Sequence, residues 1–97
     1  MIVKASTLSE VNHRTDYRIQ EFQDLLGHLV VRRTTPENPF VNKPHAGARY
    51  WFILEGQARV TVADEEAVVT AGDLVYVPEW TANSLVSESE ARWICFG

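Results

Sequence analysis

Residues 43–56 of this chain read KPHAGARYWFILEG, and residues 72–78 read GDLVYVP. Both stretches combine glycine turn residues with β-branched and aromatic residues, which favour strands. Alternate residues of a strand point to the same side, so side chains two positions apart converge on one place inside a closed sheet. The two stretches therefore indicate a fold more firmly than they indicate a function.

The second half of the chain repeats this pattern. Segments with apolar alternation recur about every eight to ten residues and are separated by turn residues, a spacing typical of an antiparallel sandwich or barrel. In one segment Ala58, Val60 and Val62 form a dry face. The segments predict strands at 49–54, 58–63, 66–70, 73–77, 82–87 and 91–96.

The residues before 40 carry weaker signals. Thr7-Leu8-Ser9-Glu10 has the form of a capping box, which predicts a single helical turn. The β-branched run that follows Leu29 predicts a strand. Prolines mark a loop over residues 36–44, and residues 20–26 are compatible with a helix or with a strand.

Length and composition limit the class of protein. The chain has 97 residues, which predicts one domain, with strands and cover in residues 1–40 and both motif stretches in residues 41–97. The net charge of −4 argues against a nucleic-acid partner, because a polyanion needs a basic surface. Cys95 is the only cysteine, so no intrachain disulfide can form, and no apolar run is long enough to span a bilayer. We expect a cytoplasmic protein without a membrane partner.

The two stretches resemble the two motifs of the cupin family, and the resemblance covers residues 43 to about 96. The first family motif carries a His-x-His pair, a Glu and a closing Gly. These positions fall here on Lys43, His45, Arg49 and Gly56. The resemblance implies an all-β fold, a small single-domain cupin jelly-roll barrel of about eight to ten strands.

The second family motif is kept in part. Its first Gly and its Pro match Gly72 and Pro78. Its later Gly, its His and its Asn are replaced by Trp80, Asn83 and Ser87. The spacing of the family is therefore kept, while most of its metal-ligand chemistry is lost.

The resemblance implies a divalent metal at four positions, which here hold Lys43, His45, Arg49 and Asn83. Protein metal sites typically use three or four nitrogen, oxygen or sulfur ligands. Protonated Lys has no acceptor and Arg is always cationic, so two of these side chains repel a cation. We expect no metal cofactor. The alternative is a weaker transition-metal site built from His45, Asn83, His28 or a rim carboxylate.

The altered positions predict a pocket for a small anionic or polar molecule. Lys43 and Arg49 supply positive charge, and Arg can hold a carboxylate or phosphate by two parallel hydrogen bonds. Trp51, one strand step deeper, supplies an apolar wall or belongs to the core. The expected ligand-binding residues are Lys43, His45, Arg49, Trp51 and Asn83.

Several of these residues also have a purely structural interpretation. Arg49 can neutralise Asp73 or Glu79 at the barrel rim. His45 can be a hydrogen-bonded pocket histidine rather than a general base. Lys43, beside a loop proline, can be solvated.

Other aromatic and titratable residues lie outside this group. We expect Trp93 and Cys95 in the core. Trp80 follows a proline in an expected exposed turn, where it can gate the pocket mouth or meet a partner. We expect His13 and His28 to be exposed.

The strand at 49–54 is apolar on both faces, so we expect another part of the protein or another subunit to cover its outer side. The candidates are the N-terminal segment and a second subunit. Cupins commonly dimerise, and a chain this short has little to spare for a cover, so we expect a homodimer. One face carries Arg49, Trp51 and Ile53, and the other carries Tyr50, Phe52 and Leu54.

Three classes of function remain open. The first is a barrel that binds a small metabolite without a metal. The second is an enzyme, either a metal-dependent oxygenase or isomerase with an unusual ligand set, or a metal-free isomerase or lyase that uses His45 as its base. The third is a structural module with a filled interior. The sequence names no substrate.

Overall fold

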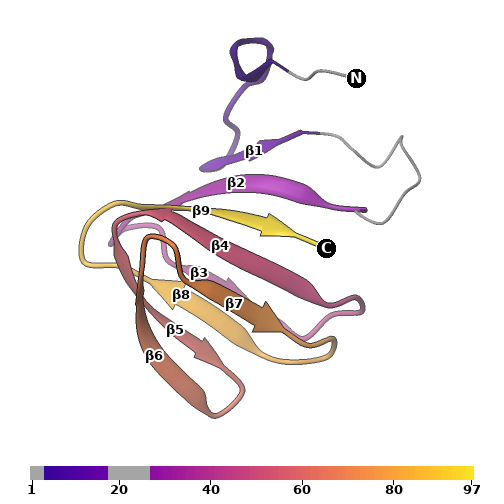
Figure 1. Ribbon diagram of the computed structural model, residues 1–97, viewed down its shortest axis with the longest axis vertical. Helices are drawn as coiled ribbons and strands as arrows, with labels where there is room; N and C mark the ends of the chain where they lie inside the picture. The colour runs from indigo at the N-terminus through magenta and orange to yellow at the C-terminus, as the bar shows by residue number, and fades with distance from the viewer. Residues whose placement is uncertain (1–3, 18–26) are drawn as a thin grey trace.

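The computed structural model describes residues 4–17 and 27–97, which form two antiparallel sheets (Figure 1). The larger sheet has the strand order β1-β2-β9-β4-β7, and the smaller has the order β3-β8-β5-β6. The question of helix or strand at 20–26 lies outside the described residues. The elements are η1 (Ala5–Thr7), β1 (Arg14–Asp16), β2 (Leu29–Thr34), β3 (Phe40–Asn42), β4 (Arg49–Glu55), β5 (Gln57–Val62), β6 (Glu65–Thr70), β7 (Leu74–Val77), β8 (Asn83–Val86) and β9 (Ala91–Phe96).

The predicted all-β jelly roll is confirmed. The six strands expected from residue 49 onward are all present, as is the strand that begins at Leu29. The expected loop at 36–44 is wrong in part because it contains β3, which pairs with β8 so that Asn42 lies opposite Asn83. Pro39 and Pro44 flank this short edge strand. Proline is tolerated there because its missing N–H removes no hydrogen bond from the interior of the sheet.

The predicted capping box is wrong. The short helix η1 precedes it, and Thr7 is its last residue rather than its cap. The Thr7 hydroxyl donates backward to the Lys4 carbonyl at 2.7 Å. The Glu10 carboxylate instead receives two hydrogen bonds from Arg33 of β2, at 3.0 and 3.1 Å. Within residues 4–17 and 27–97, no helix is long and apolar enough to cross a membrane.

The core lies between the two sheets and follows the strand alternation. Ala58 and Val60 are buried on the inner face of β5, as predicted. Trp93 and Cys95 are buried on the inner face of β9, also as predicted. The largest fully buried side chains are Trp51, Trp93, Ile53, Leu85, Val30 and Val77.

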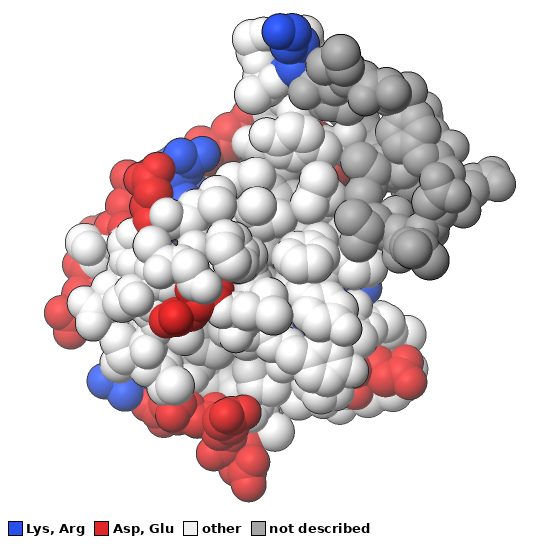
Figure 2. Space-filling view, in the orientation of Figure 1, with Lys and Arg blue, Asp and Glu red and all other residues white. Residues whose placement is uncertain are grey.

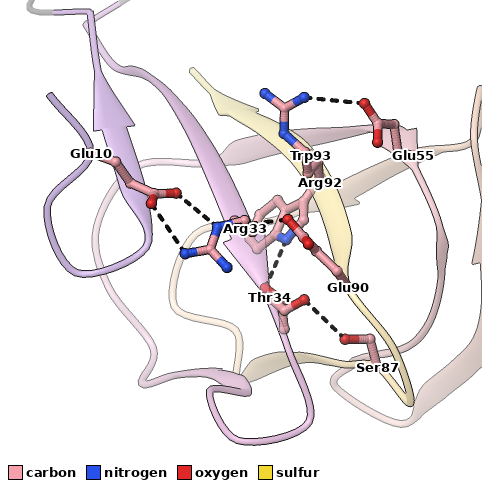
Figure 3. Close-up of polar contacts among 8 residues, drawn as sticks. All are labelled: Glu10, Arg33, Thr34, Glu55, Ser87, Glu90, Arg92 and Trp93. Atoms are coloured by element: carbon pink, nitrogen blue, oxygen red, sulfur yellow. Dashed lines mark hydrogen bonds and ion pairs between the residues drawn. The ribbon is translucent and has the colours of Figure 1, made fainter. Parts of the chain in front are cut away.

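One end of the barrel, which we call the closed end, is tied by buried hydrogen bonds (Figure 3). The Trp93 indole Nε1 donates to the Thr34 hydroxyl at 3.0 Å, and the Ser87 hydroxyl donates to the Thr34 carbonyl at 3.2 Å. Gly56 turns the chain from β4 into β5 with φ of +85°, and a Cβ there would lie 2.5 Å from the Glu90 carbonyl oxygen. At this end, therefore, these buried polar groups are hydrogen-bonded and the backbone is tightly packed.

The outer face of the larger sheet is apolar. Tyr50 and Leu74 are 40% and 60% exposed, and Phe52 and Tyr76 are also exposed. The Tyr50 ring lies 5.1 Å from that of Tyr76 and 5.5 Å from that of Phe96. Figure 2 shows a face whose charged side chains lie mostly along the edges, with one acidic group left of its largely uncharged centre. We call Tyr50, Phe52, Leu74 and Tyr76 the outer apolar face.

Candidate functional site

The other end of the barrel holds a pocket of about 240 Å³. It lies where β2 and β4 begin and where β3, β7 and β9 end, at the end that carries the C-terminus (Figure 1). We call this the pocket end. The described residues that line it are His28, Arg32, Phe40, Asn42, His45, Ala46, Arg49, Trp51, Val77, Asn83 and Cys95.

Of the five expected ligand-binding residues, the structure brings four into this pocket: His45, Arg49, Trp51 and Asn83. The fifth, Lys43, is exposed and is not part of the pocket wall, so its expected position is wrong. Lys43 follows the end of β3 and precedes Pro44, where its ammonium is solvated. The positive charge of the pocket must come from other residues.

Arg49 is the first residue of β4, and its Nη1 donates to the Ala48 carbonyl at 3.0 Å. Gly47, with φ of +84°, leaves room for the guanidinium, because a Cβ there would lie 3.0 Å from Nη1. The expected rim carboxylates are used elsewhere. The Asp73 carboxylate accepts the Thr70 N–H at 2.7 Å, and the Glu79 carboxylate accepts the Gly47 N–H at 3.4 Å. Among the residues that the structure describes, no carboxylate forms an ion pair with Arg49.

Arg32 is the second arginine of the pocket, and no pattern in the sequence had pointed to it. Its guanidinium carbon lies 4.4 Å from the centre of the Phe40 ring and 5.9 Å from that of Trp93, within reach of a cation–π interaction. Its Nε is buried and has no hydrogen-bond partner in the described part of the chain. Burial and then the charge of Arg14 lower the pKa of Arg32.

His28 also lines the pocket, so the expectation that it is exposed is wrong. Burial, and then the charges of Arg49, Arg14 and Arg32, lower its pKa to about 4, while Asp16 acts in the opposite direction. His28 is therefore neutral near pH 7. Desolvation is the larger cause of this low pKa, and the nearby arginines add to it because a cation also disfavours the imidazolium.

His45 has a defined tautomer. Its Nδ1 lies 2.9 Å from the Ala46 carbonyl, which can only accept, so Nδ1 carries the proton and Nε2 is an acceptor in the neutral ring. The His45 carbonyl accepts the Trp80 N–H at 2.8 Å. Trp80 occupies the position of a motif glycine, and it has φ of +59° and is 66% exposed. Its role as a gate or a partner contact stays a prediction.

Asn83, the first residue of β8, is buried in the pocket wall. Its Nδ2 donates to the Thr81 carbonyl at 2.9 Å. This bond fixes the orientation of the amide, because a flipped amide would place oxygen against oxygen. Its Oδ1 is buried and has no hydrogen-bond partner among residues 4–17 and 27–97.

Aromatic side chains form part of the pocket wall. The Phe40 ring packs edge-on against Trp51 and Trp93, with ring centres 5.6 and 5.1 Å apart. Trp51 is only 1% exposed, so it serves both as core and as pocket wall. Cys95 lines the same wall, and burial raises the pKa of its thiol. A nucleophilic thiolate is therefore disfavoured.

The residues at the family's metal positions do not fit a four-ligand metal site. Those positions hold the exposed Lys43, the pocket residues His45 and Asn83, and the cationic Arg49. Within the described ranges, no group of three or more His, Cys, Asp or Glu side chains lies close enough to hold a metal ion. Arg32 adds a further positive charge to the same pocket. The donor set therefore disfavours a divalent cation.

Comparisons with known proteins agree with this fold. The Cupin_2 family, a family of cupin domains, matches residues 33–97. A protein described as a predicted oxalate decarboxylase from Thermotoga maritima has a TM-score of 0.79 at 12% identity, over 99% of this chain and 96% of that chain. At this identity the likeness shows the fold alone.

Curated relatives match a shorter part of the chain. An uncharacterised protein from Streptomyces coelicolor is 40% identical over 48 residues, which are 50% of this chain and 46% of the relative. Mannose-1-phosphate guanylyltransferase 2 from Escherichia coli O157:H7 is 39% identical over 41 residues, 42% of this chain and 8% of the enzyme. This chain thus matches less than half the length of these relatives. From its strand order, its motif spacing and the family match over most of its length, the chain belongs to the Cupin_2 family of cupin domains.

Proposed function

We propose that this cupin domain binds a small anionic or polar metabolite in its pocket, without the family's four-ligand metal site. One observation carries the proposal: Arg32 and Arg49 line the pocket, and none of the described Asp and Glu side chains does. A partly buried guanidinium without a counter-ion is poorly solvated, and an anion restores both its charge balance and its hydrogen bonds. We place this function in the cytoplasm, since the one cysteine can form no intrachain disulfide.

The size of the pocket limits the ligand. Its volume of about 240 Å³ lies below the range of about 300–1,000 Å³ for drug-sized ligands, so the ligand is small. Phe40 and Trp51 favour an apolar or planar body beside the charged group. A pocket of this volume also argues against the third class of function, a structural module with a filled interior.

A thermal-shift screen of small carboxylates and phosphates, combined with elemental analysis of the purified protein, tests this proposal. We expect no stoichiometric transition metal, and a melting temperature that rises with the concentration of a bound acid. Arg49→Gln should lose the response. Arg59→Gln should keep it, because Arg59 is an exposed residue of β5 that pairs with Glu66 at 2.8 Å. Stoichiometric metal that stabilises the fold, or no response to any acid, would overturn the proposal.

A metal-free isomerase or lyase is the second candidate, and the tautomer of His45 favours it. With Nδ1 held by the Ala46 carbonyl, Nε2 is free to accept a proton from a bound acid. Incubation of the bound acid in heavy water should then exchange its α-hydrogen for deuterium. His45→Gln should abolish exchange and keep binding. If the unmodified protein binds an acid but no exchange occurs, the isomerase or lyase function is refuted and only the binding function remains.

We further propose that a second copy of this chain covers the outer apolar face. The chain carries a net charge of −4, so two copies repel each other except where an uncharged face meets its equivalent. Leu74→Glu should therefore yield monomers in sedimentation experiments. Val68→Glu, at an exposed apolar residue of the other sheet, should leave the dimer intact. A monomeric unmodified protein at high concentration would refute this assembly.

A further inference from the structure

Two residues that line the pocket, one with a donor and one with an acceptor, each have a buried polar atom that lacks a partner within the described residues. The donor is Arg32 Nε–H and the acceptor is Asn83 Oδ1, and both atoms are buried. A buried polar group without a hydrogen bond is unfavourable, and such groups are uncommon in native proteins. Of the three such atoms in the described ranges, one is Arg14 Nε, outside the pocket wall, and the other two belong to residues of this one pocket. This pair indicates a ligand that supplies an acceptor to one and a donor to the other.

The acceptor at Asn83 is strictly an acceptor. Its Nδ2 is committed to the Thr81 carbonyl at 2.9 Å, so the amide cannot turn to offer an N–H instead. A ligand group that satisfies Oδ1 must therefore be a donor. An ammonium group is disfavoured, because Arg32 and Arg49 line the same pocket and no described carboxylate does. A neutral hydroxyl fits this environment.

The donor at Arg32 requires an acceptor on the ligand. The guanidinium is held over the Phe40 ring and forms no ion pair with a described carboxylate. Guanidinium groups bind carboxylates by parallel hydrogen bonds, and Nε belongs to one of the two edges used for such pairs. Arg49 adds a second cation to the wall, so the anionic end of the ligand belongs on the arginine side of the pocket.

We propose that the ligand is a small hydroxy acid, with its carboxylate on Arg32 and Arg49 and its hydroxyl donating to Asn83 Oδ1. This assignment rests on the proposed anion-binding function and adds a requirement for a hydroxyl donor. A pocket of about 240 Å³ restricts the acid to a compact molecule. Polar sites of this kind discriminate strongly against analogues that lack the matching group, because the protein group is then left unpaired.

The test measures dissociation constants by calorimetry for matched acids that differ only at the hydroxyl. One set is lactate, propionate and 2-methoxypropionate, and a larger set is mandelate, phenylacetate and α-methoxyphenylacetate. The hydroxy acid of the set that fits should bind about tenfold or more tightly than its hydrogen and methoxy analogues. Equal affinities within a set that binds would overturn the hydroxyl assignment and leave the anion-binding function intact. If no acid binds, the proposed function itself fails.

Two substitutions locate the effect. Asn83→Leu removes the acceptor at similar size and should reduce the hydroxyl preference to about one, while the deoxy acid still binds. Asn38→Leu makes the same chemical change in an asparagine of the loop before β3 that does not line the pocket, and the preference should remain. A preference that survives in Asn83→Leu would overturn the assignment. Should Asn83→Leu not fold, the methoxy analogues alone decide, since they remove the donor without changing the protein.

Discussion

The closed end and the pocket end of the barrel differ in whether their buried polar groups have hydrogen-bond partners. At the closed end the Trp93 indole and the Ser87 hydroxyl both find acceptors on Thr34. At the pocket end Arg32 Nε and Asn83 Oδ1 find none among the described residues. Both ends belong to the same sheets, so the fold alone does not cause the difference.

The comparison separates residues that stabilise the fold from residues available for a ligand. Satisfied buried groups rigidify a core, whereas unsatisfied ones lower stability and are kept where a ligand completes them. Substitutions at the closed end should therefore cost stability. Substitutions that remove charge at the pocket end should cost binding and can gain stability.

The largest effect is expected for Gly56→Ala at the closed end. The new Cβ would lie 2.5 Å from the Glu90 carbonyl oxygen, at a φ of +85° that disfavours any L side chain. Backbone strain and overpacking together should lower the free energy of unfolding by about 3–5 kcal/mol. Urea titration followed by tryptophan fluorescence measures this change.

Gly72→Ala is the matched control for the close contact. Gly72 has φ of +91° but nothing within 4 Å of an added Cβ, so only the backbone strain remains. Its cost should be about 1–2 kcal/mol. Equal costs at the two glycines would mean that the closed end is not tightly packed.

Thr34→Val should have the next largest effect. The change keeps the shape of the side chain but leaves the buried Trp93 N–H without an acceptor, which should cost about 1–3 kcal/mol. Ser87→Ala should cost about 1 kcal/mol or less, because the bond that it removes is 3.2 Å long and therefore weak for a hydroxyl donor. Thermal unfolding of both variants compares their losses of stability. If Thr34→Val is as stable as the unmodified protein, the Trp93 hydrogen bond does not stabilise the closed end.

Arg32→Met should act in the opposite direction. It replaces a partly buried cation with an apolar chain that can pack on Phe40, so the unliganded protein should gain roughly 1 kcal/mol while the response to acids disappears. Arg33→Met, one residue along β2, should slightly destabilise the protein and keep the response, since Arg33 pairs with Glu10 and Glu90 at the surface. A destabilised Arg32→Met variant would show that Arg32 stabilises the fold rather than a ligand.

The strand pattern was predictable because each strand from residue 49 onward alternates and ends at turn residues. β3 was missed because it is short and lies between prolines, and its pairing with β8 is visible only in the fold. The capping box failed because a Thr hydroxyl bonds equally well to a preceding carbonyl.

The pocket was predictable for Arg49 and Asn83, where the motif spacing fixed the strand, and for His45, which the motif places in the loop before β4. Arg32 was missed because β2 has β-branched residues and arginines on both faces, so alternation does not tell which arginine points inward. His28 was missed because it precedes the strand, where periodicity gives no direction. Their approach to the pocket depends on the pairing of β2 with β9, which local sequence does not encode.

The last prediction is the pH dependence of stability due to His28. Its pKa is about 4 in the folded chain, below the ordinary value of 6.5, so between these limits the unfolded chain binds more protons and stability falls as the pH falls. The pKa of Glu10 is also lowered, by Arg33, but that carboxylate loses its contribution only as the pH falls below about 4.5. Of the described groups with a shifted pKa, only His28 therefore changes its protonation between pH 6.5 and about 4.5.

His28→Gln should flatten the pH dependence of the melting temperature in this window, and a slope equal to that of the unmodified protein would refute the assignment. A bound acid should also flatten it. The anion would offset the charges of Arg14, Arg32 and Arg49, which together with burial depress the pKa of His28, whereas Asp16 already opposes them. The pKa of His28 should then rise and proton uptake should accompany binding, so the affinity for the acid increases from pH 7 toward pH 5. This linkage would report an anion at the pocket end even if the Asn83 assignment failed.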